Sequence, residues 1–353
     1  MTPGPNRRAL LATALAVAAP WRALAAEPAA PRAPLLTVSR TEEGQSVIYD
    51  AYTWRRRELT KRLPPNEPWP REGEIAAQFA RFGLDKAPVP AALPVPSQIL
   101  PGLYLVNSVP NLTYLIDAGP EGLIMIDPGL KSNVEAILKA VEALGFRRGA
   151  IRWVVNTHAH FDHAMADAHF QKLGARILIG RADAPAVEKA TAVTAKAALP
   201  PAVAAAYPTA KVDWPVDDGE ELKLGDKTLI AIATPGHTPG STCYLLTLDG
   251  KNLLFGGDTI LFDYRLGAQG AVTADNVAYL ASLKKLANFF TAFGTRTRWD
   301  VLVPGHGTIV LDRAYADVTK GVRQVQWDVA NGEEVKALPF SEDGYRKIMF
   351  GRP

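Results

Sequence analysis

The chain has 353 residues, 48% of them hydrophobic and 21% charged, a balance typical of one large globular domain or two smaller ones. Its 39 basic and 36 acidic side chains give a formal net charge of +3, well short of the basic excess of most nucleic-acid-binding proteins. The single cysteine, Cys243, excludes an intramolecular disulfide. Cys243 lies in the apolar run STCYLLTL, which predicts that it belongs to the hydrophobic core.

Residues 1–25 have the pattern of a secretory signal peptide. Arg7 and Arg8 precede the apolar run ALLATALAVAA, and the small residues ALAA follow it. The adjacent arginines are also typical of the twin-arginine export route. We therefore expect a periplasmic or secreted protein with no stable membrane insertion after cleavage, and a short uncleaved anchor is the alternative. This segment holds three of the 39 basic residues and no acidic one, so 36 basic side chains face 36 acidic ones in the mature chain.

Residues 27–98 are rich in proline and charge, and we expect them to form an N-terminal extension that wraps the main domain. Within it, the segment REGEIAAQFARFGL at residues 71–84 predicts a helix. A basic run comprises residues 55–57 with Lys61 and Arg62. This run predicts one solvated helix face, and a site for an acidic ligand is the alternative.

From residue 99 onward, short β-rich runs bounded by glycine and proline are followed by amphipathic segments. The expected strands lie in residues 99–106, 112–119, 122–129, 151–156, 175–180, 227–234, 241–248, 252–257 and 299–307. The expected helices are residues 132–144, 164–174, 183–207 and 276–290. Ser132 and Glu135 have the spacing of a capping box at the first of these helices. The pattern predicts an α/β protein with two mixed β-sheets flanked by helices.

Half of the six histidines lie in one short loop, NTHAHFDHA at residues 156–164. Random placement would give three histidines at these spacings in roughly two of a thousand such chains. His158 and His160 are two positions apart, so their side chains point the same way in an extended chain and can bind one ion. Asp162 and His163 follow after a turn and are expected on the other side. Imidazole and carboxylate are standard zinc ligands. Because the loop presents two pairs of them on different sides, it predicts two metal ions.

Three further candidate ligands follow expected strands at glycine turns. His237 lies in TPGHTPG, Asp258 in GGD and His306 in PGHG. Chain ends of this kind can converge on one edge of the sheets and complete the coordination of the two ions. The sixth histidine, His169, falls inside an expected helix and is assigned to the surface.

The motifs H-x-H-x-D-H, TPGHTPG, GD and PGHG, in this order and spacing, resemble the metallo-β-lactamase superfamily. The resemblance covers about residues 99–310 and implies an αββα sandwich with two zinc ions at one edge of the paired sheets. Residues 311–353 are expected to form a C-terminal helical tail that packs on this catalytic domain. The implied ligands of the first zinc are His158, His160 and His237, and those of the second are Asp162, His163 and His306.

Two aspartates complete the implied site. Asp258 resembles the carboxylate that bridges both metals in glyoxalase II and related hydrolases. Asp127, in IDPG, resembles an acid that orients the ligands, and a simple turn aspartate before Pro-Gly is the alternative. Zinc is the expected metal, with iron and manganese as secondary candidates.

The resemblance implies an exported dinuclear zinc hydrolase that acts on a small molecule, namely an ester, thioester, lactone or β-lactam. A metal-bound hydroxide would be the nucleophile, and Asp162 would orient it and move its proton. Specificity is expected from residues 27–98, 185–215 and 260–275, where Tyr264 and Arg265 are either ordinary loop residues or partners of a substrate carboxylate.

Three alternative functions stay open. A dedicated metallo-β-lactamase fits the three-histidine site, the long tail and export, although these enzymes generally lack an aspartate at the position of Asp258. A mononuclear iron oxidoreductase similar to the persulfide dioxygenases fits the histidine loop. A non-catalytic binding protein is disfavoured, because all seven ligand positions are intact.

Overall fold

The computed structural model describes residues 93–108, 110–260, 274–288 and 299–316, shorter stretches between residues 33 and 86, and positions 318, 322 and 326. The expected signal peptide and the loop with Tyr264 and Arg265 lie outside these residues. Within the described part of the chain, no helix is both long enough and apolar enough to cross a membrane.

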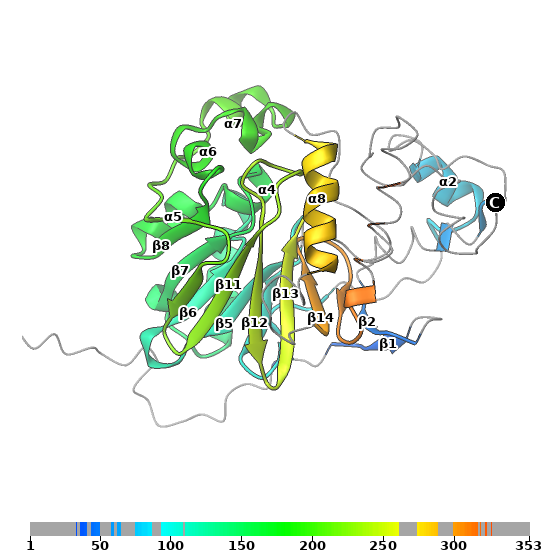
Figure 1. The fold of residues 1–353 in the computed structure, drawn as a ribbon, viewed down its shortest axis with the longest axis horizontal. Coiled ribbons are helices and arrows are strands. Elements are labelled where there is room, and N and C mark those ends of the chain that lie inside the picture. The colour runs from blue at the N-terminus through cyan, green and yellow to red at the C-terminus, as the bar shows by residue number, and fades with distance from the viewer. Residues whose placement is uncertain are drawn as a thin grey trace, which may run out of the picture.

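The described strands form two sheets (Figure 1). The strands are β1 (Ser39–Arg40), β2 (Ser46–Ile48), β3 (Ser97–Leu100), β4 (Leu103–Asn107), β5 (Thr113–Asp117), β6 (Leu123–Ile126), β7 (Ile151–Asn156), β8 (Arg176–Gly180), β9 (Trp214–Val216), β10 (Glu221–Leu224), β11 (Lys227–Ala233), β12 (Thr242–Leu248), β13 (Lys251–Gly257), β14 (Val301–Pro304) and β15 (Ile309–Val310). One sheet has the order β1-β2-β15-β14-β13-β12-β11-β10, and the other has the order β3-β4-β5-β6-β7-β8-β9.

Helices α3 (Val134–Ala143), α4 (Phe161–Ala164), α5 (Asp167–Lys172) and α6 (Ala184–Lys189) pack on the outer face of the seven-stranded sheet. The other described helices are α7 (Pro201–Ala205), α8 (Asn276–Ala287) and α2 (Ile75–Arg81), the last of which forms a small separate cluster with Leu59, Leu63 and Leu84. In β6, Ile124 and Ile126 belong to the core between the sheets, whereas Leu123 and Met125 pack with α3 and α5 on the outer side. This alternation follows from the two-residue period of a strand that is buried on both faces. Helix α8 lies beside β13 in Figure 1, over the other sheet. The predicted α/β architecture of two mixed, helix-flanked sheets is confirmed.

Strand direction gathers the functional loops at one edge. Strands β6, β7, β8 and β9 are parallel to one another, and β13 is parallel to β14. Strand β11 is antiparallel to β12, which is antiparallel to β13, so β11 and β13 also run the same way. The carboxyl ends of parallel strands meet at the same edge of a sheet, where ligand sites of α/β proteins are usually built.

The N-terminal segment contributes directly to the sandwich. Strands β1 and β2 extend the eight-stranded sheet through β15. The Ser46 backbone N–H and hydroxyl donate to the Asp312 carboxylate at 3.0 and 2.7 Å, which ties this segment to the chain after β15. Ala314 and Val318, from the expected C-terminal tail, are buried against α8. The expected limits of the extension and of the tail stay predictions, since much of both lies outside the described residues.

One local expectation was wrong and another needs refinement. Helix α3 begins without a capping box: the Ser132 hydroxyl bonds to Asn133, and Glu135 pairs with Arg148 at 2.7 Å. The alanine-rich segment 183–207 is largely helical as expected, but it is divided into short helices, because Ala190 and Ala195 adopt positive φ angles of 48° and 53° between α6 and α7. A residue in this left-handed region ends an α-helix.

Candidate metal centre

Every predicted site residue lies at or just beyond the carboxyl end of a strand, on the same edge of the sandwich. Asp127 follows β6, the histidine loop follows β7, His237 follows β11, Asp258 follows β13 and His306 follows β14. Three groups of these side chains bring one ligand atom each within 4.8 Å of the others: His158, His160 and His237; His158, His163 and Asp258; and Asp162, His163 and His306.

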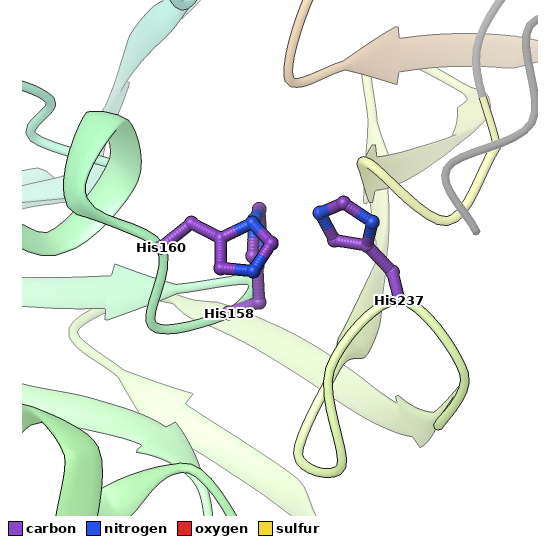
Figure 2. Close-up of side chains that lie close together, drawn as sticks. All are labelled: His158, His160 and His237. Carbon is purple, nitrogen blue, oxygen red and sulfur yellow. The ribbon is translucent and has the colours of Figure 1, made fainter. Parts of the chain in front are cut away.

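The first group is formed by three buried histidines. Figure 2 shows His158 and His160 from one loop facing His237 from another. Their ring centroids are 4.7 Å apart for His158 and His160, 4.7 Å for His158 and His237, and 4.4 Å for His160 and His237. Each side chain is less than a tenth exposed. Three imidazoles converging from two loops are a donor set suited to zinc or a similar ion.

The unpaired nitrogens of this group fit a metal ion. The Nε2 atoms of His158, His160 and His237 are buried and have no hydrogen-bond partner among the residues that the structure describes. A buried polar atom without a partner costs free energy, which a coordinate bond would recover. Burial lowers the pKa of His160 to about 4 and that of His237 to about 3, and it also lowers the pKa of His158. These rings are therefore neutral at pH 7, which is the form that binds metals.

The group of Asp162, His163 and His306, called the second group from here on, differs electrostatically from the three histidines. His163 Nε2 lies 3.1 Å from His306 Nε2, and His306 Nε2 lies 3.2 Å from Asp162 Oδ2. Burial alone would lower the pKa of His163, but the nearby carboxylates, led by Asp258, raise it to about 10. Burial likewise opposes ionisation of Asp162, but the charge of His163 and a hydrogen bond from His306 hold its pKa well below the usual range. A concentration of negative charge around two imidazoles is a cation-binding environment.

Asp258 lies between the two groups. Its Oδ1 is 3.5 Å from His163 Nε2, and its Oδ2 is 3.6 Å from His237 Nε2 and 3.5 Å from His306 Nε2. These separations exceed a hydrogen bond. They match the distance of about 3.4 Å between two ligand atoms of one tetrahedral ion with bonds near 2.1 Å. The carboxylate therefore has the position that a ligand shared by two ions requires.

Hydrogen bonds orient three of the rings so that Nε2 faces the centre. Asp127 accepts from the backbone N–H and the hydroxyl of Thr157, both at 2.7 Å, and from His163 Nδ1 at 2.9 Å. Because the Thr157 hydroxyl is committed to Asp127, it accepts from His158 Nδ1 at 3.1 Å. His306 Nδ1 donates to the Pro110 carbonyl at 2.8 Å. Ligating histidines are typically held by such a bond from their other nitrogen.

Asp127 combines both of its expected roles. It adopts a left-handed backbone conformation with φ of 51°, as a turn residue before Pro-Gly can, and its carboxylate contacts His163 and Thr157. Thr157 was missed by the sequence analysis, although its position beside His158 was a usable signal. Asp183 was missed as well, although it follows strand β8 at the same edge. His169 is exposed as expected, and Cys243 is buried in the core.

The loops approach one another so closely that glycine is required. A Cβ added to Gly305 would lie 2.5 Å from Asp258 Oδ1 and 2.7 Å from His163 Cε1. A Cβ added to Gly257 would meet the Thr157 side chain. These two glycines therefore leave room for the side chains of the site.

We expect Gly305→Ala to displace Asp258 or His163, weakening metal binding and lowering the free energy of unfolding by about 1–3 kcal/mol, as overpacking does. Gly149→Ala is the matched control, because a Cβ there would meet no atom of the described residues within 4 Å. Metal content after dialysis and urea unfolding would be measured for both variants. Full metal content in the Gly305 variant would show that the close approach has no functional consequence.

Comparison with known proteins identifies several relatives of this chain. The chain is 29% identical over 187 residues to a probable metallo-hydrolase of Methanocaldococcus jannaschii, covering 53% of this chain and 83% of that protein. It is 31% identical over 162 residues to a hydroxyacylglutathione hydrolase of Bartonella tribocorum, covering 44% and 54%. It is 28% identical over 152 residues to a mitochondrial persulfide dioxygenase of Bos taurus, covering 42% and 48%. The match spans about half the length of the last two relatives.

A solved structure shares the fold. A metallo-beta-lactamase family protein of Thermus thermophilus superposes with a TM-score of 0.54 at 21% identity, over 72% of this chain and 89% of that one. Residues 107–293, more than half of the chain, match the family model described as the metallo-beta-lactamase superfamily. The chain therefore belongs to the metallo-β-lactamase superfamily.

Proposed function

We propose that this protein is an exported hydrolase with two zinc ions that cleaves a small ester, thioester, lactone or β-lactam. Membership of the metallo-β-lactamase superfamily supports a metal-dependent hydrolase acting on a small molecule. The main support for two metal ions is the position of Asp258, whose carboxylate lies 3.5–3.6 Å from histidines of both ligand groups. Export rests on the pattern of residues 1–25 and would be tested by the N-terminal sequence of the mature protein.

In this proposal His158, His160 and His237 would hold one ion and Asp162, His163 and His306 the other. Asp258, which faces histidines of both groups, would serve both ions. Bound zinc would supply a nucleophilic water near neutral pH and polarise the scissile carbonyl. The chain itself supplies the orientation of the ligands and a carboxylate that can accept a proton. Asp162 suits that second task better than Asp258, because its side chain is 19% exposed to solvent and that of Asp258 is 8% exposed.

Hydrolysis by the zinc-loaded protein tests this function. The panel would contain a hydroxyacyl-glutathione thioester, an aryl ester, a lactone and a chromogenic cephalosporin, each with a chelated control. We expect chelator-sensitive turnover of at least one thioester, ester or lactone, since a hydroxyacylglutathione hydrolase is among the relatives. Turnover of the cephalosporin alone would instead identify a dedicated β-lactamase. Bound zinc without any turnover would contradict the proposed activity.

An iron oxidoreductase is the second candidate, favoured by the likeness to a persulfide dioxygenase. The convergence of Asp162, His163 and His306 into a second ligand group favours two ions over one. Metal analysis of the purified protein together with oxygen uptake on a persulfide would decide between them. One iron per chain with oxygen consumption would replace the hydrolase proposal.

A further inference from the structure

Asp183 is a fully buried carboxylate near the metal centre that belongs to neither ligand group. It follows strand β8 and occupies the N-cap position of α6. Aspartate at such a position normally caps the helix by accepting a hydrogen bond from its first turn. The Asp183 side chain makes no capping bond. Its carboxylate is therefore directed to other partners.

Those partners are the two loops that carry the first group of histidines. Oδ2 accepts from the backbone N–H of Ala159, which lies between His158 and His160, at 2.9 Å. Oδ2 also accepts from the hydroxyl of Thr238, the residue after His237, at 2.7 Å. Oδ1 accepts from the backbone N–H of Gly240 at 2.7 Å. One carboxylate thus bridges the histidine loop of residues 156–164 and the His237 loop.

Asp183 and the His237 loop are in such close contact that a side chain larger than glycine would not fit between them at position 240. A Cβ added to Gly240 would lie 2.6 Å from Asp183 Cβ and 2.7 Å from its Cγ. All three donors are buried, and the Ala159 side chain is fully enclosed. Loss of the shared acceptor would leave two buried backbone N–H groups unsatisfied, so the two loops would have to move apart or admit water.

We propose that Asp183 is a positioning residue that fixes the separation of the two loops, so that the imidazoles of His158, His160 and His237 face a single ion. The inference rests on the proposed metal site and assigns a role in it to a residue that binds no metal. Outer contacts of this kind typically change metal affinity by 10–100-fold when they are removed.

The test is a cobalt(II) titration of the metal-free protein, followed by visible absorption and by competition with a chelator of known affinity. Asp183→Asn keeps the shape of the side chain but places an amide NH₂ against at least one of the three donors. We expect the affinity of the three-histidine site to fall about tenfold or more and its absorption band to change, while the second site keeps the wild-type affinity.

Asp213→Asn is the matched control. The Asp213 carboxylate also accepts a backbone N–H, that of Ile177 at 3.0 Å, but it contacts neither histidine loop. This variant should bind cobalt as the wild type does, even if it unfolds at a lower temperature. A similar loss of affinity in both variants would overturn the inference, because it would reflect general destabilisation.

Thr238→Val is a second variant that tests the same contact if Asp183→Asn does not fold. It removes one of the three hydrogen bonds to Asp183, so it should weaken the same site in the same direction. Affinity within twofold of wild type in the folded variants would overturn the role of Asp183 while leaving the metal site intact. A wild-type protein that binds no cobalt would instead overturn the proposed function, so the two failures are distinguishable.

Discussion

Removal of bound metal should lower the melting temperature by roughly 8–16 °C. A ligand at a thousandfold excess over its Kd adds about 4 kcal/mol to the free energy of unfolding. In a domain of this size, each kcal/mol shifts the melting temperature by roughly 2–4 °C. The physical reason is the set of buried Nε2 atoms of His158, His160 and His237, which have no hydrogen-bond partner in the described part of the chain. The proximity of His163 Nε2 and His306 Nε2, at 3.1 Å, adds to the cost of an empty centre.

Calorimetry of zinc-loaded and chelated protein would measure this difference, and addition of zinc to the chelated sample should restore it. His160→Ala should abolish most of the difference because it removes a ligand. His169→Ala is the matched control, since His169 is exposed and lies outside the ligand groups. Equal melting temperatures with and without metal would contradict the assignment of the buried histidines as ligands.

If the protein is the proposed hydrolase with two ions, Asp258→Asn should reduce the metal content toward one ion per chain and lower hydrolysis by more than about 100-fold, because loss of a ligand should cost at least as much as loss of a residue that only orients one. The substitution preserves the size of the side chain but removes the negative charge that faces His163, His237 and His306. Two cations held close together need a shared anion to offset their repulsion, and a neutral amide offsets it poorly.

Elemental analysis after gel filtration, together with the initial rate on the best substrate of the panel, would measure both effects. Asp226→Asn is the control, because Asp226 lies in the turn between β10 and β11, at the opposite ends of the strands. Two ions and full activity in the Asp258 variant would exclude a bridging role. One ion with full activity would show that a mononuclear centre performs the reaction.

The placement of the candidate ligands at one edge of the sheets was predictable because it depends on local sequence. Each one follows a hydrophobic strand at a turn, and strand patterns are set by the two-residue period of side chains. The same reasoning identified helices α3 and α8 and the meander from β3 to β6. It also assigned His169 to the surface and Cys243 to the core. In each case the hydrophobic pattern of a short segment is sufficient.

Capping, helix continuity and the sheet edge were not predictable in this way. Glu135 had the spacing of a capping residue, but Arg148, thirteen positions along the chain, binds it instead. Asp183 occupies an N-cap position, but buried N–H groups of two distant loops compete successfully for its carboxylate. Strand β2 joins β15 through hydrogen bonds between segments more than 250 residues apart, which no local pattern specifies.

The sequence by itself determined which side chains this protein brings to one edge of two sheets, because local patterns of apolar residues, glycine and proline specify where strands end and turns begin. Only the tertiary structure decided how those side chains are grouped. The position of Asp258 between the two groups, and the bridge from Asp183 to the loops of His160 and His237, depend on distances between separate loops. Those distances are set by the packing of the two sheets and by close contacts at residues such as Gly305, not by the spacing of residues along the chain.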